Sequence, residues 1–115
     1  MVELTPAAWH VLLVLADGER HGYAVMRDVE TQSGGAVRLG PGTLYRTIKR
    51  LVDDGLIEES QERPDPALDD ERRRYYRITA AGRRAAVAEA ERLARLVENA
   101  RRRLTPSTGL AGGGA

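Results

Sequence analysis

The chain has 115 residues, which is enough for one compact domain with a single hydrophobic core. Phenylalanine and cysteine are absent, so the core must consist mainly of aliphatic side chains, and disulfides and thiolate metal sites are excluded. The chain has 18 Lys and Arg against 17 Asp and Glu, and this net charge of +1 neither indicates nor excludes a polyanionic partner.

Two short helices are predicted in the first part of the chain. The first is expected to begin at Thr5 as N-cap, with Pro6 at the first helical position, and to end at Gly18. The second is expected from about His21 to Ser33, where a pair of glycines follows. Both have apolar residues at helical spacing, so each is predicted to pack one face on a common core.

A third helix is predicted between Gly40 and Gly55, with a sharp division between its two faces. Its buried stripe is expected to consist of Leu44, Ile48, Leu51 and Val52. The outward side offers hydrogen-bond donors for base edges and phosphates: Gly42, Thr43, Arg46, Lys49 and Arg50, with Tyr45 at the flank. A helix of this kind after two short helices is typical of a helix-turn-helix, in which the third helix enters the major groove.

The same basic face has a simpler interpretation. Three basic residues on one side of a helix also occur as an ordinary solvated face. Asp53 and Asp54 follow at a spacing that allows ion pairs with two of them. The third helix alone therefore leaves both interpretations open.

A β-hairpin is predicted after the third helix. Its strands are expected at residues 56–61 and 74–79, with a charged loop at 62–73 between them. Arg72, Arg73 and Arg74 lead into the second strand, and a wing carrying three arginines beside a basic helix is suited to contact a neighbouring groove or backbone. Acidic residues in the same loop offer the alternative that these arginines are paired within the wing.

The last predicted helix begins after Thr79 and ends near Arg103, which gives a rod of about 36 Å. Apolar residues follow one another in steps of four and three, as in a coiled-coil seam: Ala86, Ala90, Leu93, Val97, Ala100 and Leu104. We expect this seam to pair with a second copy of the chain, and the alternative is packing on its own domain. Residues 105–115 are expected to form a flexible tail.

Three segments of the chain are similar to the PadR family of bacterial transcriptional regulators. They are residues 39–57, which contain Gly-Thr-Leu-Tyr, residues 74–83, and His-Gly-Tyr at 21–23; the resemblance extends over roughly residues 4–84. It implies a winged-helix fold, dimerisation through the C-terminal helix, and repression relieved by a small molecule. It also implies that Thr43, Tyr45 and Arg46 lie at the DNA, with Lys49 behind them and Tyr23 near the backbone.

The chain departs from longer members of that family in two ways. A single helix follows the wing, as in the family's short subfamily, and this helix has no aromatic residue. A stacking pocket for a planar effector therefore depends on Trp9, which has an alternative role in closing the core or the dimer base.

No catalytic or metal-binding pattern is present. The two histidines, His10 and His21, have no third ligand at a matching spacing, and we expect capping or surface roles for them. No secretion signal and no apolar stretch of roughly 18 residues is found, so we expect a cytoplasmic protein without a membrane partner. We predict no enzyme activity and no cofactor.

The sequence thus predicts a mainly α fold with a small β-hairpin: a winged helix-turn-helix domain at 1–79 and a dimerisation helix at 80–104. The predicted function is that of a homodimeric repressor that binds an inverted repeat in double-stranded DNA and is released by a small-molecule effector. The alternative is a winged-helix module that binds proteins and not DNA.

Overall fold

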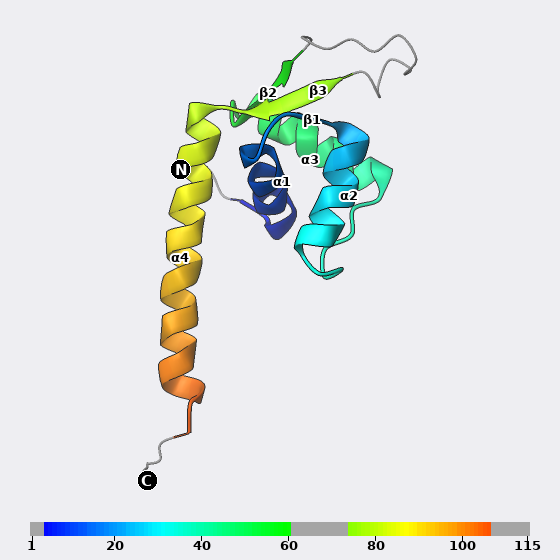
Figure 1. The fold of residues 1–115 in the computed structure, drawn as a ribbon. Helices are drawn as coiled ribbons and strands as arrows, with labels where there is room; N and C mark the ends of the chain where they lie inside the picture. The colour runs from blue at the N-terminus through cyan, green and yellow to red at the C-terminus, as the bar shows by residue number, and fades with distance from the viewer. Residues whose placement is uncertain (1–3, 61–73, 107–115) are drawn as a thin grey trace.

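The structure, a computed structural model, describes residues 4–60 and 74–106. Within these ranges the elements are, in chain order, α1 (Pro6–Ala16), β1 (Arg20–His21), α2 (Gly22–Gln32), α3 (Pro41–Asp53), β2 (Ile57–Ser60), β3 (Tyr75–Ile78) and α4 (Ala80–Leu104). The helices α1, α2 and α3 pack together beside the small sheet, and α4 extends away from them (Figure 1). The predicted fold, mainly helical with a hairpin and a long last helix, is confirmed.

Local capping explains where the first two helices begin. The Thr5 hydroxyl oxygen accepts a hydrogen bond from the Ala8 N–H at 3.1 Å, and Pro6 occupies the first turn of α1. The His21 Nδ1 atom accepts from the Ala24 N–H at 3.2 Å, so an imidazole caps α2 in place of the usual hydroxyl or carboxylate. The capping role expected for His21 is thus confirmed.

The sheet has three strands in the order β1-β3-β2, all antiparallel. Strands β2 and β3 were predicted from the sequence, whereas β1 was not, because two residues are too few to show an alternating pattern. Arg20 lies opposite Tyr76 and His21 opposite Tyr75, and the His21 and Tyr75 rings meet edge to face with centroids 5.6 Å apart. The start of α2 is therefore fixed directly to the second strand of the wing.

The core forms where α1, α2 and α3 meet under β2 and β3. Its largest fully buried side chains are aliphatic: Leu12, Leu15, Leu44, Leu51, Ile57, Val11, Val25 and Val29. The prediction that Val52 belongs to the buried stripe of α3 is wrong, because its side chain is 38% exposed. Leu44, Ile48 and Leu51 form the buried face of α3. Val52 lies about 80° around the helix from Leu44, at the edge of that face.

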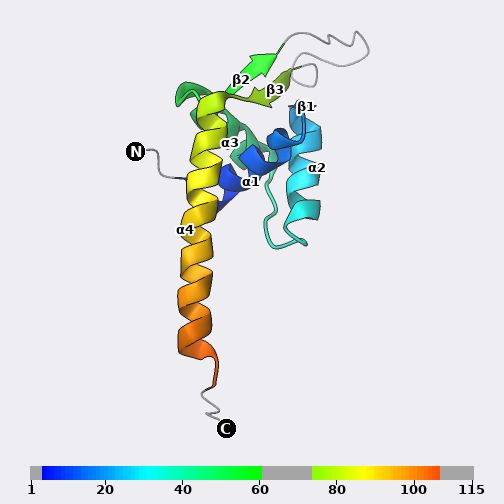
Figure 2. The same ribbon diagram turned by 60° about the vertical axis from the view of Figure 1, so that its left-hand side comes forward.

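The first turns of α4 are anchored to the domain, and the rest projects from it. Thr79 donates from its hydroxyl to the Gly55 carbonyl at 2.7 Å, and its backbone N–H donates to the Leu56 carbonyl at 3.0 Å. Gly82 and Ala86 are the buried residues of this helix. Both ribbon views show the C-terminal part of α4 extending away from the other helices (Figures 1 and 2), so α4 does not pack along its length on its own domain.

Candidate nucleic-acid interface

The outward face of α3 is basic and accessible, as predicted. Gly42, Thr43, Arg46, Lys49 and Arg50 are all exposed. Arg46 donates from Nη2 to the Thr43 hydroxyl at 3.2 Å and forms no ion pair with any residue that the structure describes. Its guanidinium group therefore keeps most of its donors for another partner.

Two of these basic residues have acidic partners on their own helix. The Lys49 Nζ atom lies 3.0 Å from an Asp53 carboxylate oxygen, and the Arg50 Nε atom lies 4.0 Å from Asp54. The ion pairs suggested for a solvated face are therefore present. Exposed pairs of this kind contribute about 0–1 kcal/mol, so a polyanion can displace the carboxylates at little cost.

Tyr45 connects α3 with the start of α2. Its ring is half-buried against the core, and its hydroxyl lies beside Gly22. A Cβ atom at position 22 would be 2.7 Å from the Tyr45 hydroxyl, so glycine there lets the phenol reach the N-terminus of α2. Tyr23 follows with 55% of its surface exposed. The structure thus places the Tyr45 hydroxyl beside the residue that precedes Tyr23 in α2.

The described part of the wing has its arginines in cross-strand ion pairs. The Arg77 Nε atom lies 2.8 Å from Glu58, which is directly opposite in the register, and the Arg74 Nε atom lies 3.7 Å from Glu59. The expected partners were acidic residues of the loop, but those found here lie on β2. Arg72, Arg73 and the acidic residues at 62–71 fall outside the described residues.

Tyr76 belongs to the hydrophobic core and lies on β3 opposite Glu59. Only 5% of its surface is exposed. Burial raises the pKa of the Tyr76 phenol, and the nearby Glu59 carboxylate raises it further. The fold therefore favours the neutral phenol at the base of the wing.

The seam predicted on α4 divides into two parts. Ala86 is 7% exposed and belongs to the core of its own domain, so it is not available on the open surface. Leu93 is half-buried, whereas Ala90, Val97, Ala100 and Leu104 are exposed. Val97 is 49% exposed and Leu104 79%, which leaves an apolar stripe in water along the projecting part of the helix.

Trp9 lies on α1 and closes the contact between α1 and α4. Its ring is half-buried against the core, and its indole N–H donates to the Ala86 carbonyl at 3.2 Å. The ring also meets His10 edge to face, with centroids 5.7 Å apart. The expectation that Trp9 closes the core matches this packing, and its expected role in effector binding stays a prediction.

Neither a metal centre nor a membrane span is found in the described ranges. No group of three or more His, Cys, Asp or Glu side chains there is placed to hold a metal ion. The His10 Nδ1 atom lies 2.9 Å from Gln32 Nε2, whereas the His21 Nδ1 atom caps α2, so the two histidines have different partners. No helix in residues 4–60 and 74–106 is long and apolar enough to cross a bilayer.

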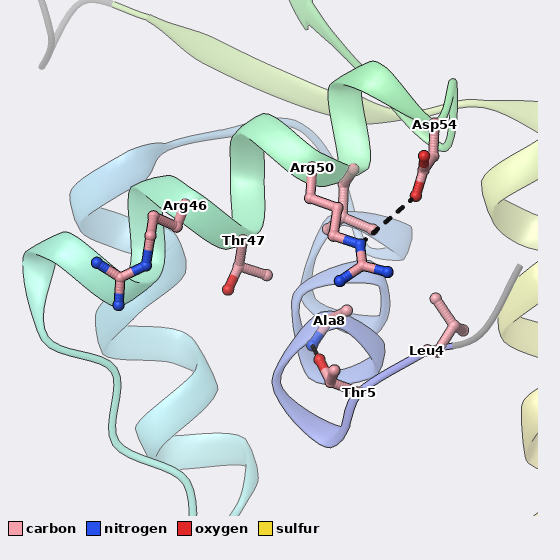
Figure 3. Close-up of a pocket in the computed structure, with 8 residues that line it drawn as sticks. Leu4, Thr5, Ala8, Arg46, Thr47, Arg50 and Asp54 are labelled. Atoms are coloured by element: carbon pink, nitrogen blue, oxygen red, sulfur yellow. Dashed lines mark hydrogen bonds and ion pairs between the residues drawn. The ribbon is translucent and has the colours of Figure 1, made fainter.

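A pocket lies between α1 and α3, and nothing in the sequence predicted it. Thr5, Thr47 and Asp54 line this pocket together with Arg46 and Arg50 (Figure 3). Helical spacing places four of these residues on one flank of α3, and the sequence alone shows this: Arg46, Thr47, Arg50 and Asp54. The sequence does not show that this flank lies beside the first turn of α1, because that depends on how the two helices cross.

Comparison with known proteins identifies relatives over most of the chain. The family model described as "Transcriptional regulator PadR-like family" matches residues 11–88. The transcriptional regulator Rv3488 of Mycobacterium tuberculosis is 40% identical over 105 residues, which are 91% of this chain and 89% of that protein. An uncharacterised 37.1 kDa protein in transposon TN4556 of Streptomyces fradiae is 41% identical over 86 residues, which are 75% of this chain and 22% of that protein.

Among solved structures, a PadR family transcription regulator from Clostridium difficile R20291 superposes with a TM-score of 0.68. The alignment covers 89% of this chain and 100% of that one at 18% identity, and this likeness establishes the winged-helix fold alone.

Proposed function

The chain belongs to the PadR-like family of transcriptional regulators, and we propose that it regulates transcription by binding double-stranded DNA as a homodimer. The observation that carries this proposal is the exposed basic face of α3. Arg46 on that face has no ion-pair partner among the described residues. A protein-binding module has no need of unpaired cationic donors at this position.

In the proposed complex the N-terminal half of α3 lies in the major groove. Arg46 contacts a base edge or a phosphate at the groove centre, and Lys49 and Arg50 contact mainly phosphates once Asp53 and Asp54 are displaced. Tyr23 lies in the first turn of α2, and the Tyr45 hydroxyl reaches that turn from α3, where a phenol and backbone N–H groups can meet the sugar-phosphate backbone. The wing arginines contribute to affinity more than to sequence preference.

The proposed dimer forms along the exposed part of α4. Ala90, Leu93, Val97, Ala100 and Leu104 repeat with coiled-coil spacing, and most of them are exposed in the single chain. Two chains related by a two-fold axis present two α3 helices, so the DNA site is an inverted repeat with half-site centres about 34 Å apart.

Selection of bound sequences from random DNA with the purified protein tests this function. We expect an inverted repeat to be enriched. A protein-interaction module is the alternative, and it predicts no enrichment of any DNA sequence over the starting pool.

We further propose that the bound dimer represses transcription and that a small molecule releases it, as the family resemblance implies. Trp9 offers a half-exposed ring for such a ligand, although its N–H is already bonded to Ala86. Transcription from a template carrying the selected repeat should fall when the protein is added. An increase would establish activation in its place.

A further inference from the structure

The pocket between α1 and α3 has the size of a small-molecule site. Its volume is about 330 Å³, within the roughly 300–1,000 Å³ range in which proteins bind small ligands. It lies between the first turn of α1 and the flank of α3, and Figure 3 shows the Arg50 side chain reaching from α3 toward that turn. A single phosphate group would fill only a small part of this space.

One wall of the pocket is aliphatic and firmly supported. It consists of Leu4, Ala8 and Leu51. Leu51 is 2% exposed and Ala8 is 8% exposed, so both are backed by the core. No aromatic side chain lines the pocket, and its wall offers dispersion contacts and no stacking surface.

The rim of the pocket carries a guanidinium group and a hydroxyl donor. Figure 3 shows the Arg50 guanidinium group above the first turn of α1, and its Nε atom lies 4.0 Å from the Asp54 carboxylate. The Arg46 guanidinium group is directed toward the other end of α3, where it donates to the Thr43 hydroxyl. The Thr5 hydroxyl oxygen accepts from the Ala8 N–H, which leaves its own O–H to donate to a different acceptor. Donors and positive charge on the rim above an aliphatic wall match a ligand with an anionic head and an apolar body.

We propose that this pocket binds a small aliphatic organic anion, with its carboxylate on Arg50 and its chain against Leu4, Ala8 and Leu51. Arg50 also faces DNA in the proposed function, on which this step rests, so the ligand and DNA compete directly for it. A DNA phosphate carries the same charge but has no aliphatic chain. Binding measured without DNA therefore reports the organic anion alone and not a DNA phosphate.

The first experiment measures hexanoate binding to the full chain by calorimetry in the absence of DNA. Arg50→Gln and Lys49→Gln form a matched pair, because both remove one positive charge from α3 but only Arg50 lines the pocket. We expect Lys49→Gln to bind hexanoate like the parent chain and Arg50→Gln to bind about tenfold more weakly. Hexanamide, without the charge, and acetate, without the chain, should each also bind at least about tenfold more weakly.

Two results of this experiment would overturn the pocket assignment. One is equal hexanoate affinity in Arg50→Gln and Lys49→Gln, with both variants shown to be folded by circular dichroism. The other is equal affinity for hexanoate and acetate, which would leave only a general attraction of anions to a basic surface.

The second experiment measures competition with DNA. At a hexanoate concentration ten times its dissociation constant, the apparent Kd for the selected DNA should rise about tenfold per pocket, and sodium chloride of equal ionic strength should have a much smaller effect. Unchanged DNA affinity at saturating hexanoate would overturn the competition. If the chain binds no DNA at all, the proposed function fails, and the calorimetric comparison still decides whether the pocket binds the anion.

Discussion

At Gly82 the backbone of α4 passes close to the rest of the domain. A Cβ atom there would lie 2.0 Å from the Leu56 carbonyl oxygen and 2.8 Å from an Ile78 side-chain carbon. Replacing glycine by alanine inside a helix ordinarily stabilises a protein by about 0.5–1 kcal/mol. Here the backbone of Leu56 occupies the space, so the sign is reversed.

Gly82→Ala should therefore lower the free energy of unfolding by about 1–3 kcal/mol through overpacking. Gly42→Ala is the matched control, because the nearest atom to its added Cβ is a flexible Arg46 nitrogen at 3.6 Å. Urea denaturation of both variants checks the prediction. A Gly82→Ala midpoint at or above that of the parent chain would show that α4 does not cross Leu56 in this way.

Tyr76 gives the fold a dependence on alkaline pH. Burial raises the pKa of its phenol above that of a free tyrosine, about 10. The raised pKa means that the neutral form contributes stability, which is fully present below about pH 10 and is lost as the pH rises through the higher folded value.

Tyr76→Phe should therefore lose less stability than the parent chain between about pH 9 and pH 12, because phenylalanine has no proton to release. Tyr23→Phe, at a position that is 55% exposed, should retain the parent dependence. Chemical denaturation at a series of pH values measures both. The same slope in all three proteins would contradict the burial of an ionisable group at position 76.

At the scale of the element, β1 and the cap of α2 are one structural unit. His21 pairs with Tyr75 in the sheet, and its side chain accepts the Ala24 N–H. His21→Ala should cost about 1 kcal/mol of unfolding free energy through the lost cap, and His21→Asn should restore most of it because asparagine is a good N-cap residue. Thermal or urea denaturation tests this order. Equal stability of the alanine and asparagine variants would argue against a capping role.

The sequence predicted those elements whose signals are local. Thr5 before Pro6 indicated where α1 begins. The four-three apolar spacing of residues 86–104 indicated where α4 lies. Both signals are local, because capping and periodicity act within a few residues. Strand β1 was missed because its two residues are extended only through pairing with Tyr75 and Tyr76, more than fifty positions away.

In the candidate site, too, local features could be predicted from the sequence and contacts between helices could not. The exposure of Arg46, Lys49 and Arg50 could be predicted from helical spacing alone. The pocket beside Arg50 and the contact between Tyr45 and Gly22 could not, because both depend on how α3 crosses α1 and α2. Val52 was assigned to the core because periodicity gives the direction of a side chain but not the width of the surface that covers it.

At the scale of the whole molecule, the proposed dimer depends on the projecting part of α4. Val97 is 49% exposed in the single chain, so an arginine at this position leaves the domain intact. Within a paired seam the same arginine would be an unpaired buried charge, which costs several kcal/mol. Val97→Arg should therefore convert the dimer to a monomer, whereas Glu91→Arg on another side of α4 should not. Light scattering measures this, and a dimeric Val97→Arg protein would place the interface elsewhere.

The proposed function requires that α3 is the element that reads DNA, which the affinity of one double variant for the selected inverted repeat at several salt concentrations tests. Arg46→Ala with Lys49→Ala should bind at least about 1–3 kcal/mol more weakly per half-site, with a salt dependence reduced by about one to two counterions per half-site. The control is Arg101→Ala with Arg103→Ala, which removes the same charge from the far end of α4 and should retain the parent affinity. Parent affinity in a folded, dimeric Arg46/Lys49 double variant would contradict the assignment of α3 as the reading helix.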